Sequence, residues 1–231
     1  LASFAYGYNS ANQRTNVTHA DNSHWTFGYD NLGQVSSGKK RNGSNQLFPG
    51  LQYEYAYDDI GNRTQTRSGG NTAGANLRTN NYSANLLNQY TNRSVASYLE
   101  VHGEAATNAT VTVNNQTTDR LGTFYRRELT FDNSSAPLQS GIPNVAVIKN
   151  GGTNNQDIVT TETGNRRVPQ DPGSFTHDAD GNLTSDSRWT NTWKGENRLI
   201  KMESRSSVPA AARRKLLFAY DHQGRRIRKV V

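Results

Sequence analysis

The chain has 231 residues, a formal net charge of +7 and no cysteine. Without cysteine it has neither a disulfide framework nor a thiolate metal site, and it has no apolar run long enough to cross a membrane. Only 32% of its residues are hydrophobic and its mean hydropathy is −0.87, a polarity typical of disorder. The 11 tyrosines, 7 phenylalanines and 3 tryptophans argue against disorder, because they can supply a core.

Five segments place aromatic residues at alternate positions and follow them with Asp or Asn, a turn, and then Arg, Leu or Val. They are residues 4–14, 25–35, 53–63, 175–183 and 218–226. Residues two apart on a strand point to the same face, Asp suits the first position of a turn, and Gly suits a position with positive φ. Each repeat therefore predicts a β-hairpin, and such hairpins must stack side by side to be stable.

Each kind of repeat residue is given one structural role. The packed aromatic stripe is assigned to Tyr6, Tyr8, Phe27, Tyr29, Tyr55, Tyr57 and Tyr220. The turns are assigned to the carboxylates Asp30, Asp58, Asp178 and Asp221 and the glycines Gly33, Gly61, Gly181 and Gly224. The first repeat departs by having Asn9 and Asn12 for Asp and Gly, and the fourth by having His177 for Tyr.

The repeat pattern stops in the middle of the chain. Strands are expected there at 98–102, 109–113, 124–131, 144–148 and 157–161, with turn signals between them. A strand spacing near ten residues predicts a small, immunoglobulin-like β-sandwich. The expected domains are repeat hairpins in 1–91, an inserted β-sandwich-like module in 92–168, and further repeat hairpins in 169–231.

These repeats resemble the YD repeats of the Rhs family and its relatives, the teneurins and the C component of insecticidal toxin complexes. The best match is Asp178-Ala-Asp-Gly-Asn-Leu-Thr-Ser-Asp followed by Trp189-Thr-Asn-Thr-Trp-Lys-Gly-Glu-Asn-Arg-Leu, which is similar to the family's DxxGN(L/R)T stretch leading into W-x-x-E-N-R-L. The resemblance covers 1–91 and 169–231. It implies an all-β fold in which hairpins form a curved or spiralling antiparallel sheet.

The resemblance also implies a setting and partners. In the family such sheets form shells that enclose toxin domains or present adhesive surfaces outside the cell, so a secreted or cell-surface bacterial protein is expected. The expected partners are the remaining repeats of a longer chain, or copies of this chain that pair through edge strands. The basic runs at 213–215 and 225–229 raise the question of nucleic acid, but a solvated sheet face or Arg stacked on aromatics is the favoured interpretation.

No catalytic residue, cofactor site or metal site is predicted. The stretch from Asp178 to Asn182 begins like a calcium loop, but its sixth position is Leu183 and its glycine is the fourth residue, which favours a hairpin turn. Asp58 and Asp59 are adjacent, so on a strand they would point apart and could not act as a carboxylate pair. The chain has no nucleophile elbow, phosphate-binding loop or dinucleotide motif.

Trp189 and Trp193 give the best hint of ligand binding. They are four residues apart, so a strand would present both on one face, where they would either stack on a sugar ring or cover the repeat core. The sequence favours a non-enzymatic structural segment that builds a shell or fibre. A carbohydrate- or cell-surface-binding adhesion module is the alternative, and a polysaccharide-acting enzyme is a weaker one because it needs a cleft of convergent groups.

Overall fold

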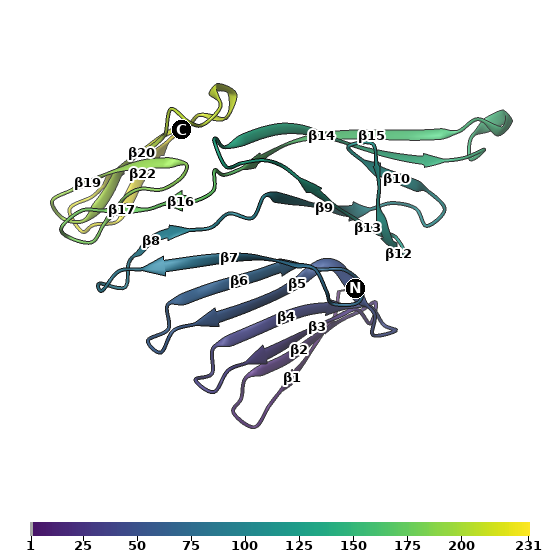
Figure 1. The fold of residues 1–231 in the computed structure, drawn as a ribbon, viewed down its shortest axis with the longest axis horizontal. Coiled ribbons are helices and arrows are strands. Elements are labelled where there is room, and N and C mark those ends of the chain that lie inside the picture. Colours follow the sequence, from purple (N-terminus) through teal and green to yellow (C-terminus); the bar gives the residue numbers. More distant parts are fainter. Residues whose placement is uncertain (1) are drawn as a thin grey trace. The chain divides into compact units, whose positions relative to one another are not determined.

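The computed structural model describes residues 2–231 and confirms the all-β class. Its 22 strands pair in an antiparallel manner within four sheets, and the described residues contain no α-helix, only the 3₁₀ turns η1 (Thr153–Asn155) and η2 (Ala210–Ala212) (Figure 1). Contacts divide the chain into two compact units. Unit 1 comprises Leu1–Asn81, Tyr98–Thr130 and Gly141–Asn165, and unit 2 comprises Tyr82–Ser97, Phe131–Ser140 and Arg166–Val231.

The first strands follow one another in chain order within one nine-stranded sheet (Figure 1). They are β1 (Phe4–Tyr8), β2 (Arg14–His19), β3 (His24–Tyr29), β4 (Val35–Arg41), β5 (Leu47–Tyr57), β6 (Arg63–Gly69) and β7 (Leu77–Ala84). The hairpins β1–β2, β3–β4 and β5–β6 coincide with the first three repeats. Each has a register shift just before its last tyrosine, at Tyr8, Tyr29 and Tyr57, so a bulge precedes every turn.

The middle of the chain forms two small sheets. Their strands are β9 (Tyr98–Glu104), β10 (Thr110–Val113), β11 (Gln116–Thr117), β12 (Asp119–Leu121), β13 (Phe124–Thr130), β14 (Leu138–Ile148) and β15 (Ile158–Val168). The sheet orders are β12-β13-β9 and β11-β10-β14-β15. All five expected strands are present, with β14 and β15 longer than expected. The immunoglobulin likeness and the domain division at residues 91 and 168 stay predictions.

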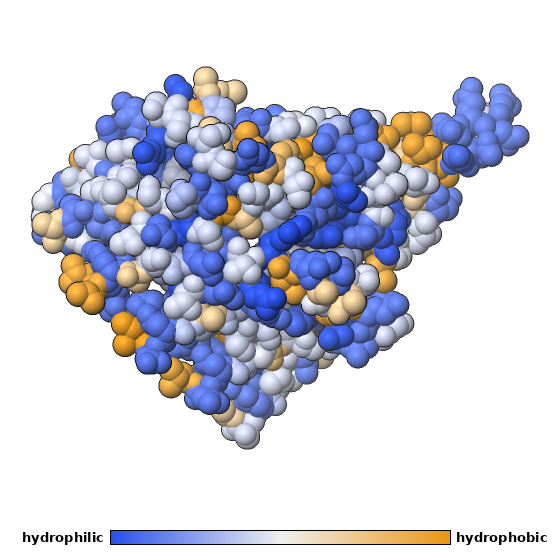
Figure 2. All heavy atoms as spheres, viewed as in Figure 1, coloured by the Kyte–Doolittle hydropathy of each residue, from blue (hydrophilic) through white to orange (hydrophobic). Residues whose placement is uncertain are grey.

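Most of the fully buried apolar side chains lie in these two sheets rather than in the repeats. Val113, Leu129 and Ile142 are almost completely inaccessible, whereas Tyr6 and Tyr8 on β1 are about half exposed. The visible surface is mainly hydrophilic, with hydrophobic residues in small separate groups (Figure 2). The low mean hydropathy is therefore compatible with folding, because thin repeat sheets bury little and the core is concentrated elsewhere.

Unit 2 contains the remaining hairpins. The end of β7 pairs with β8 (Tyr90–Arg93), which pairs with β16 (Gly173–Ser174). A separate sheet holds six strands in chain order: β17 (Thr176–His177), β18 (Leu183–Ser185), β19 (Trp189–Lys194), β20 (Arg198–Ser204), β21 (Lys215–Tyr220) and β22 (Arg226–Val230). The hairpins β17–β18 and β21–β22 are the fourth and fifth repeats, and each has a bulge before its turn.

Candidate functional site

The turn of the third repeat shows how a single side chain closes a hairpin. Asp58 Oδ1 accepts the main-chain N–H groups of Ile60 (3.2 Å) and Asn62 (2.7 Å), and its Oδ2 accepts the Asn62 amide (2.9 Å). The main chain adds a bond from Gly61 N–H to the Asp58 carbonyl (3.1 Å). Gly61 has a φ of 90°, a left-handed value that glycine adopts without strain. One carboxylate therefore satisfies the donors of a tight five-residue turn.

The same pair of Oδ1 bonds, to residues two and four positions ahead, recurs along both units. It is made by Asn9, Asp30, Asn42, Asp58, Asn71, Asn85, Asp178 and Asp221. The fourth residue of each of these turns has positive φ and is always Gly or Asn, namely Asn12, Gly33, Asn45, Gly61, Gly74, Asn88, Gly181 and Gly224. Asn can replace both Asp and Gly because its amide oxygen accepts the same bonds and its backbone tolerates this conformation.

Sequence reasoning missed the turns at Asn42, Asn71 and Asn85. No strand-end tyrosine precedes them, since Arg41, Gly70 and Ala84 stand in that place. A search for Asn or Asp followed three positions later by Asn or Gly would have found them, because all eight turns share that pair. The pair also occurs at Asp119 and Gly122, where Asp119 lies in β12.

Tyrosine hydroxyls tie three of the hairpins to the strand before them. Tyr29 donates to the Arg14 carbonyl (2.7 Å) and Tyr57 to the Val35 carbonyl (3.0 Å). In each case the accepting residue stands opposite the last tyrosine of the preceding hairpin, because Arg14 pairs with Tyr8 and Val35 pairs with Tyr29. In the six-stranded sheet Tyr220 donates in the same way to the Leu199 carbonyl (2.9 Å), opposite Trp193.

The other stripe aromatics pack within their sheets. Phe27 stacks on Trp25 at 6.4 Å, and Tyr55 stands opposite Thr66 on β6. Arginines lie over two of the rings, with Arg14 4.5 Å from the centre of Tyr6 and Arg226 5.5 Å from the centre of Phe218. These contacts use cationic side chains to cover aromatic faces that the thin sheets leave open.

The turn hydrogen bonds stabilise the ionised carboxylates. The Asn62 side chain, with main-chain N–H groups, lowers the pKa of Asp58 below its ordinary 3.8. The Arg225 side chain and main chain lower the pKa of Asp221 in the same way. For Asp178, desolvation acts in the opposite direction, but hydrogen bonds from Asn182 and Asp180 outweigh it and lower the pKa. The carboxylates are thus committed to turn closure as anions.

A buried ion cluster joins the repeat sheet to the central strands inside unit 1. Arg126 donates from Nε to Glu100 (2.7 Å) and from Nη2 to both Glu100 (2.6 Å) and Glu128 (3.0 Å). A Cβ at Gly69 would lie 2.6 Å from Glu100 Oε1, and one at Gly50 would lie 3.1 Å from Arg126 Cγ. Any other residue at these positions would displace the Glu100 or Arg126 side chain, and it would also be strained because Gly50 and Gly69 have φ values of 84° and 94°.

Two further contacts support this joint, by which we mean the contact between the repeat sheet and the central strands of unit 1. The Tyr98 and Ser68 hydroxyls are 2.6 Å apart, and the rings of Phe48 and Phe124 meet edge to face at 5.1 Å. Burial alone would lower the pKa of Arg126, but the hydrogen bonds and charge of Glu100 and the other carboxylates raise it above its ordinary value. The guanidinium is therefore a fixed cation whose hydrogen bonds lie within the β12-β13-β9 sheet. The ion pair that crosses from the repeat sheet is made by Arg78 of β7 with Glu128.

Trp189 and Trp193 lie on β19 and are both half-buried. The Trp193 indole N–H donates to the Leu183 carbonyl of β18 (2.8 Å), and Arg188 lies 5.0 Å from the ring centre of Trp189. The Trp193 side chain is therefore bonded to its own sheet, and sugar stacking by the two tryptophans stays a prediction.

Residues 2–231 contain no group of three or more His, Asp or Glu side chains placed to hold a metal ion. None of the helical segments within that range has the length and apolarity that a membrane crossing requires.

No protein-family model and no curated protein matches the chain. Solved crystal structures that are similar to it include those of TcdB2-TccC3-Cdc42 and TcdB2-TccC3-TEV. Their TM-scores are 0.38 and 0.36 and their identities 13% and 12%, over 99% of this chain. This chain spans 11% of the length of each matched chain. At TM-scores and identities this low, the two structures do not indicate the function of this chain.

Proposed function

We propose that the chain is a non-enzymatic structural segment of an extracellular Rhs/YD-repeat protein, whose hairpins build a β-sheet shell or fibre that encloses or presents a partner. The observation that carries this proposal is the recurrence of one turn and one tyrosine bond. Every repeat closes through an Asp or Asn oxygen, and three tyrosines attach their hairpin to the preceding strand by the same register rule. A unit that is copied for packing is typical of repeat architecture.

The use of the polar side chains supports a structural role. Several carboxylates are held by turn donors, at Asp58, Asp178 and Asp221, or by arginine, at Glu100 and Glu128. General acid–base catalysis requires such groups to face a substrate. Their engagement in turns and joints leaves them fixed as scaffold.

The proposed partners are further repeats, whether of a longer parent chain or of a second copy, and they would pair at the outer edge of β1. Within the described range β1 pairs with β2 alone, and Phe4, Tyr6 and Tyr8 are 55%, 48% and 54% exposed. By the rule of the inner hairpins, Tyr8 would donate its hydroxyl to a carbonyl of the added strand. An exposed aromatic edge strand is a template for such pairing.

The test is the concentration dependence of association. Light scattering of the chain over a wide concentration range should show assembly, and Tyr6→Lys with Tyr8→Lys should suppress it by placing charge on the edge. Tyr55→Lys, on a strand that is paired on both sides, is the matched control and should not act through the β1 edge. A stable monomer at high concentration would contradict edge association.

A second candidate is carbohydrate or cell-surface binding at β19, which the half-buried Trp189 and Trp193 favour. Such rings can stack on a ligand while their other edge remains in the sheet. A glycan array should then give a saturable signal that falls for Trp193→Ala and persists for Trp25→Ala, whose ring stacks on Tyr53 within its own sheet. Absence of signal from wild type on a broad array would leave the structural role alone.

A further inference from the structure

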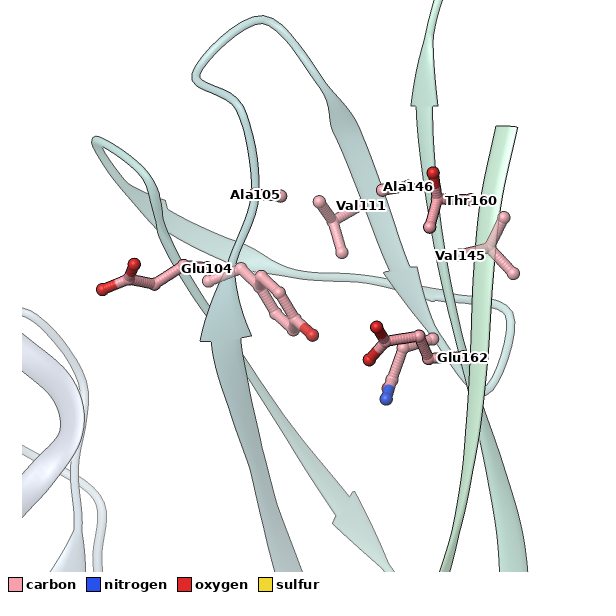
Figure 3. Close-up of a pocket in the computed structure, with 9 residues that line it drawn as sticks. Glu104, Ala105, Val111, Val145, Ala146, Thr160 and Glu162 are labelled. Atoms are coloured by element: carbon pink, nitrogen blue, oxygen red, sulfur yellow. The ribbon is translucent and has the colours of Figure 1, made fainter. Parts of the chain in front are cut away.

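The cavity between the two central sheets of unit 1 offers little to a ligand (Figure 3). Its volume is about 90 Å³, and Val111, Val145 and Ala146 provide apolar walls. Glu162 is exposed to solvent, and within residues 2–231 only the Asn144 Oδ1 atom of the lining is buried without a hydrogen-bond partner. One such acceptor does not make a binding site, because a site needs several polar groups that converge on a guest.

The hairpins of the chain share one bulge, and this bulge defines a common register. On the first strand of each hairpin the register shifts just before one residue, which we call the bulge residue. Its partner on the second strand, which we call the return residue, always lies six positions later. The seven pairs are Tyr8–Arg14, Tyr29–Val35, Tyr57–Arg63, Ala84–Tyr90, His177–Leu183, Trp193–Leu199 and Tyr220–Arg226.

Neighbouring hairpins contact each other in one register as well. The residue three positions after a return residue pairs with the residue four positions before the bulge residue of the next hairpin. This holds for Val17–Trp25, Gly38–Tyr53, Thr66–Asn80, Arg93–Gly173 and Met202–Leu216. The side chains at these positions differ, so the register belongs to the repeat and not to a particular pair of residues.

The tyrosine bond follows from this register. Tyr29, Tyr57 and Tyr220 are bulge residues, and each donates its hydroxyl to the carbonyl of the return residue in the hairpin before it. A contact between two hairpins therefore needs a second strand with an open carbonyl at its return residue and a first strand with a tyrosine at its bulge.

Two strand edges of the chain meet these requirements without being paired to each other. Within residues 2–231, β22 pairs with β21 alone and β1 pairs with β2 alone. β22 is the second strand of its hairpin and has Arg226 as its return residue, while β1 is a first strand and has Tyr8 as its bulge residue. The two edges are therefore the complementary halves of one hairpin-to-hairpin contact.

We propose that copies of this chain dock head to tail, with β1 of one copy pairing with β22 of another in the register of the inner hairpins. This pairing presupposes the edge association proposed above and specifies its partner edge. The register places Lys229 opposite Phe4 and Ile227 opposite Tyr6, and it directs the Tyr8 hydroxyl to the Arg226 carbonyl. The contact would cover the Ile227 side chain, which is 67% exposed, together with the exposed aromatic rings of β1.

Charge favours this pairing over the pairing of like edges. β22 carries the exposed cations Arg226, Arg228 and Lys229, whereas β1 has no charged residue. Two β22 strands would set cations against cations, which destabilises a ladder. Between β22 and β1 a cation meets an aromatic ring instead, and such a contact is favourable. Two β1 strands would provide no return residue for the tyrosine hydroxyls.

The first test asks which edges meet, and it uses the double variant Tyr6→Lys with Tyr8→Lys. This variant has a blocked β1 and an intact β22. In sedimentation velocity a fluorescently labelled sample should be monomeric alone but should enter assemblies of the wild-type chain, which it caps through β22. A head-to-tail contact leaves one free edge of each kind, so the wild-type assemblies should grow beyond a dimer.

Two further substitutions in the labelled variant show whether β22 is the edge that it uses. Adding Ile227→Asp places an anion where Tyr6 of the wild type would pack, and it should reduce incorporation by about tenfold or more. Leu86→Asp is the matched control, because it places the same charge on a fully exposed turn residue, and it should leave incorporation unchanged.

The outcomes separate this pairing from the function proposed above. If the wild-type chain assembles but excludes the labelled variant, edge association stands and the head-to-tail pairing is overturned. If the wild-type chain stays monomeric at high concentration, edge association itself is contradicted.

Engineered cysteines test the register, since the chain has no cysteine of its own. Tyr6→Cys mixed with Ile227→Cys should form a mixed disulfide, because directly opposite residues lie within reach of one. Ala5→Cys is one residue out of register and points to the other face, so it should react with Ile227→Cys about tenfold more slowly or less. Phe4→Cys with Lys229→Cys probes the same register if Tyr6→Cys does not fold. Equal rates for Tyr6→Cys and Ala5→Cys, or disulfides mainly between two Tyr6→Cys copies, would overturn the proposal.

Discussion

Removal of the Glu100 side chain should cost about 3 kcal/mol of folding stability, although Glu100 makes none of the repeat-turn hydrogen bonds. Glu100 accepts two bonds from Arg126 (2.7 and 2.6 Å), and the two side chains are 15% and 9% exposed. Breaking a buried pair from one side costs about 3–5 kcal/mol because it leaves an uncompensated charge. Glu128 (3.0 Å) and Asp119 (3.3 Å) remain beside Arg126, so Glu100→Ala belongs at the lower end of that range.

Thermal unfolding followed by circular dichroism is the assay. For a chain of this size each kcal/mol shifts Tm by about 2–4 °C, so a fall of about 6–12 °C is expected for Glu100→Ala. The matched control is Glu54→Ala, which also loses two cations, Lys39 (2.9 Å) and Arg67 (2.9 Å), but from a side chain that is 27% exposed. Pairs of that exposure contribute at most about 1 kcal/mol each, so the control should fall much less.

A double-mutant cycle isolates the pair itself. Glu100 and Glu128 stand directly opposite each other on β9 and β13, so Arg126→Leu alone leaves two like charges facing across the ladder. Arg126→Leu should therefore cost more than Glu100→Leu, and the double variant should cost about 2 kcal/mol less than the sum of the two. Simple additivity of the two costs would refute the idea that Arg126 acts through Glu100.

Three further predictions concern the repeats. Gly61→Ala should cost about 1–2 kcal/mol in urea denaturation because of its positive φ, and Gly61→Asn less, since Asn88 fills the same turn position. A hydrogen bond from the Asn62 side chain lowers the pKa of Asp58 below 3.8. The contribution of Asp58 to folding stability is therefore complete above pH 3.8 and is lost as the pH falls through the lowered pKa. Asp58→Asn should make the Tm depend less on pH in this acidic range. Tyr57→Phe removes its 3.0 Å bond to β4 and should cost about 1 kcal/mol, measured by urea denaturation.

The repeats could be predicted from sequence because their information is local. An aromatic at every second position, an Asp and a Gly specify strand, turn and return within about ten residues, and the five hairpins are present where they were expected. The turns at Asn42, Asn71 and Asn85 were not predicted, because no aromatic residue precedes them and the prediction relied on one. The physical requirement was only an acceptor oxygen at the first position and tolerance of positive φ at the fourth.

The joint inside unit 1 could not be predicted in the same way. It depends on Gly50 and Gly69 of the repeat sheet meeting Glu100 and Arg126, residues 31 to 76 positions further along the chain. Glycines are usually explained by turns, and an Arg between two glutamates on neighbouring strands has no local signature. Such contacts depend on which sheets pack against each other, and this packing cannot be inferred from a single sequence.

Asp and Asn form the same turn, so the turn geometry does not depend on the charge of its first residue. The turns at Asn9, Asn42, Asn71 and Asn85 make the same Oδ1 bonds as those with Asp, so replacing these four by Asp would lower the net charge from +7 to +3 with the turn bonds kept. A net charge far from zero opposes self-association, while the exposed edge of β1 favours it. Asn at these four positions therefore keeps the hairpins intact and leaves the chain more positively charged. Two copies then repel each other, so stable pairing at β1 requires enough register-matched hydrogen bonds to overcome that repulsion.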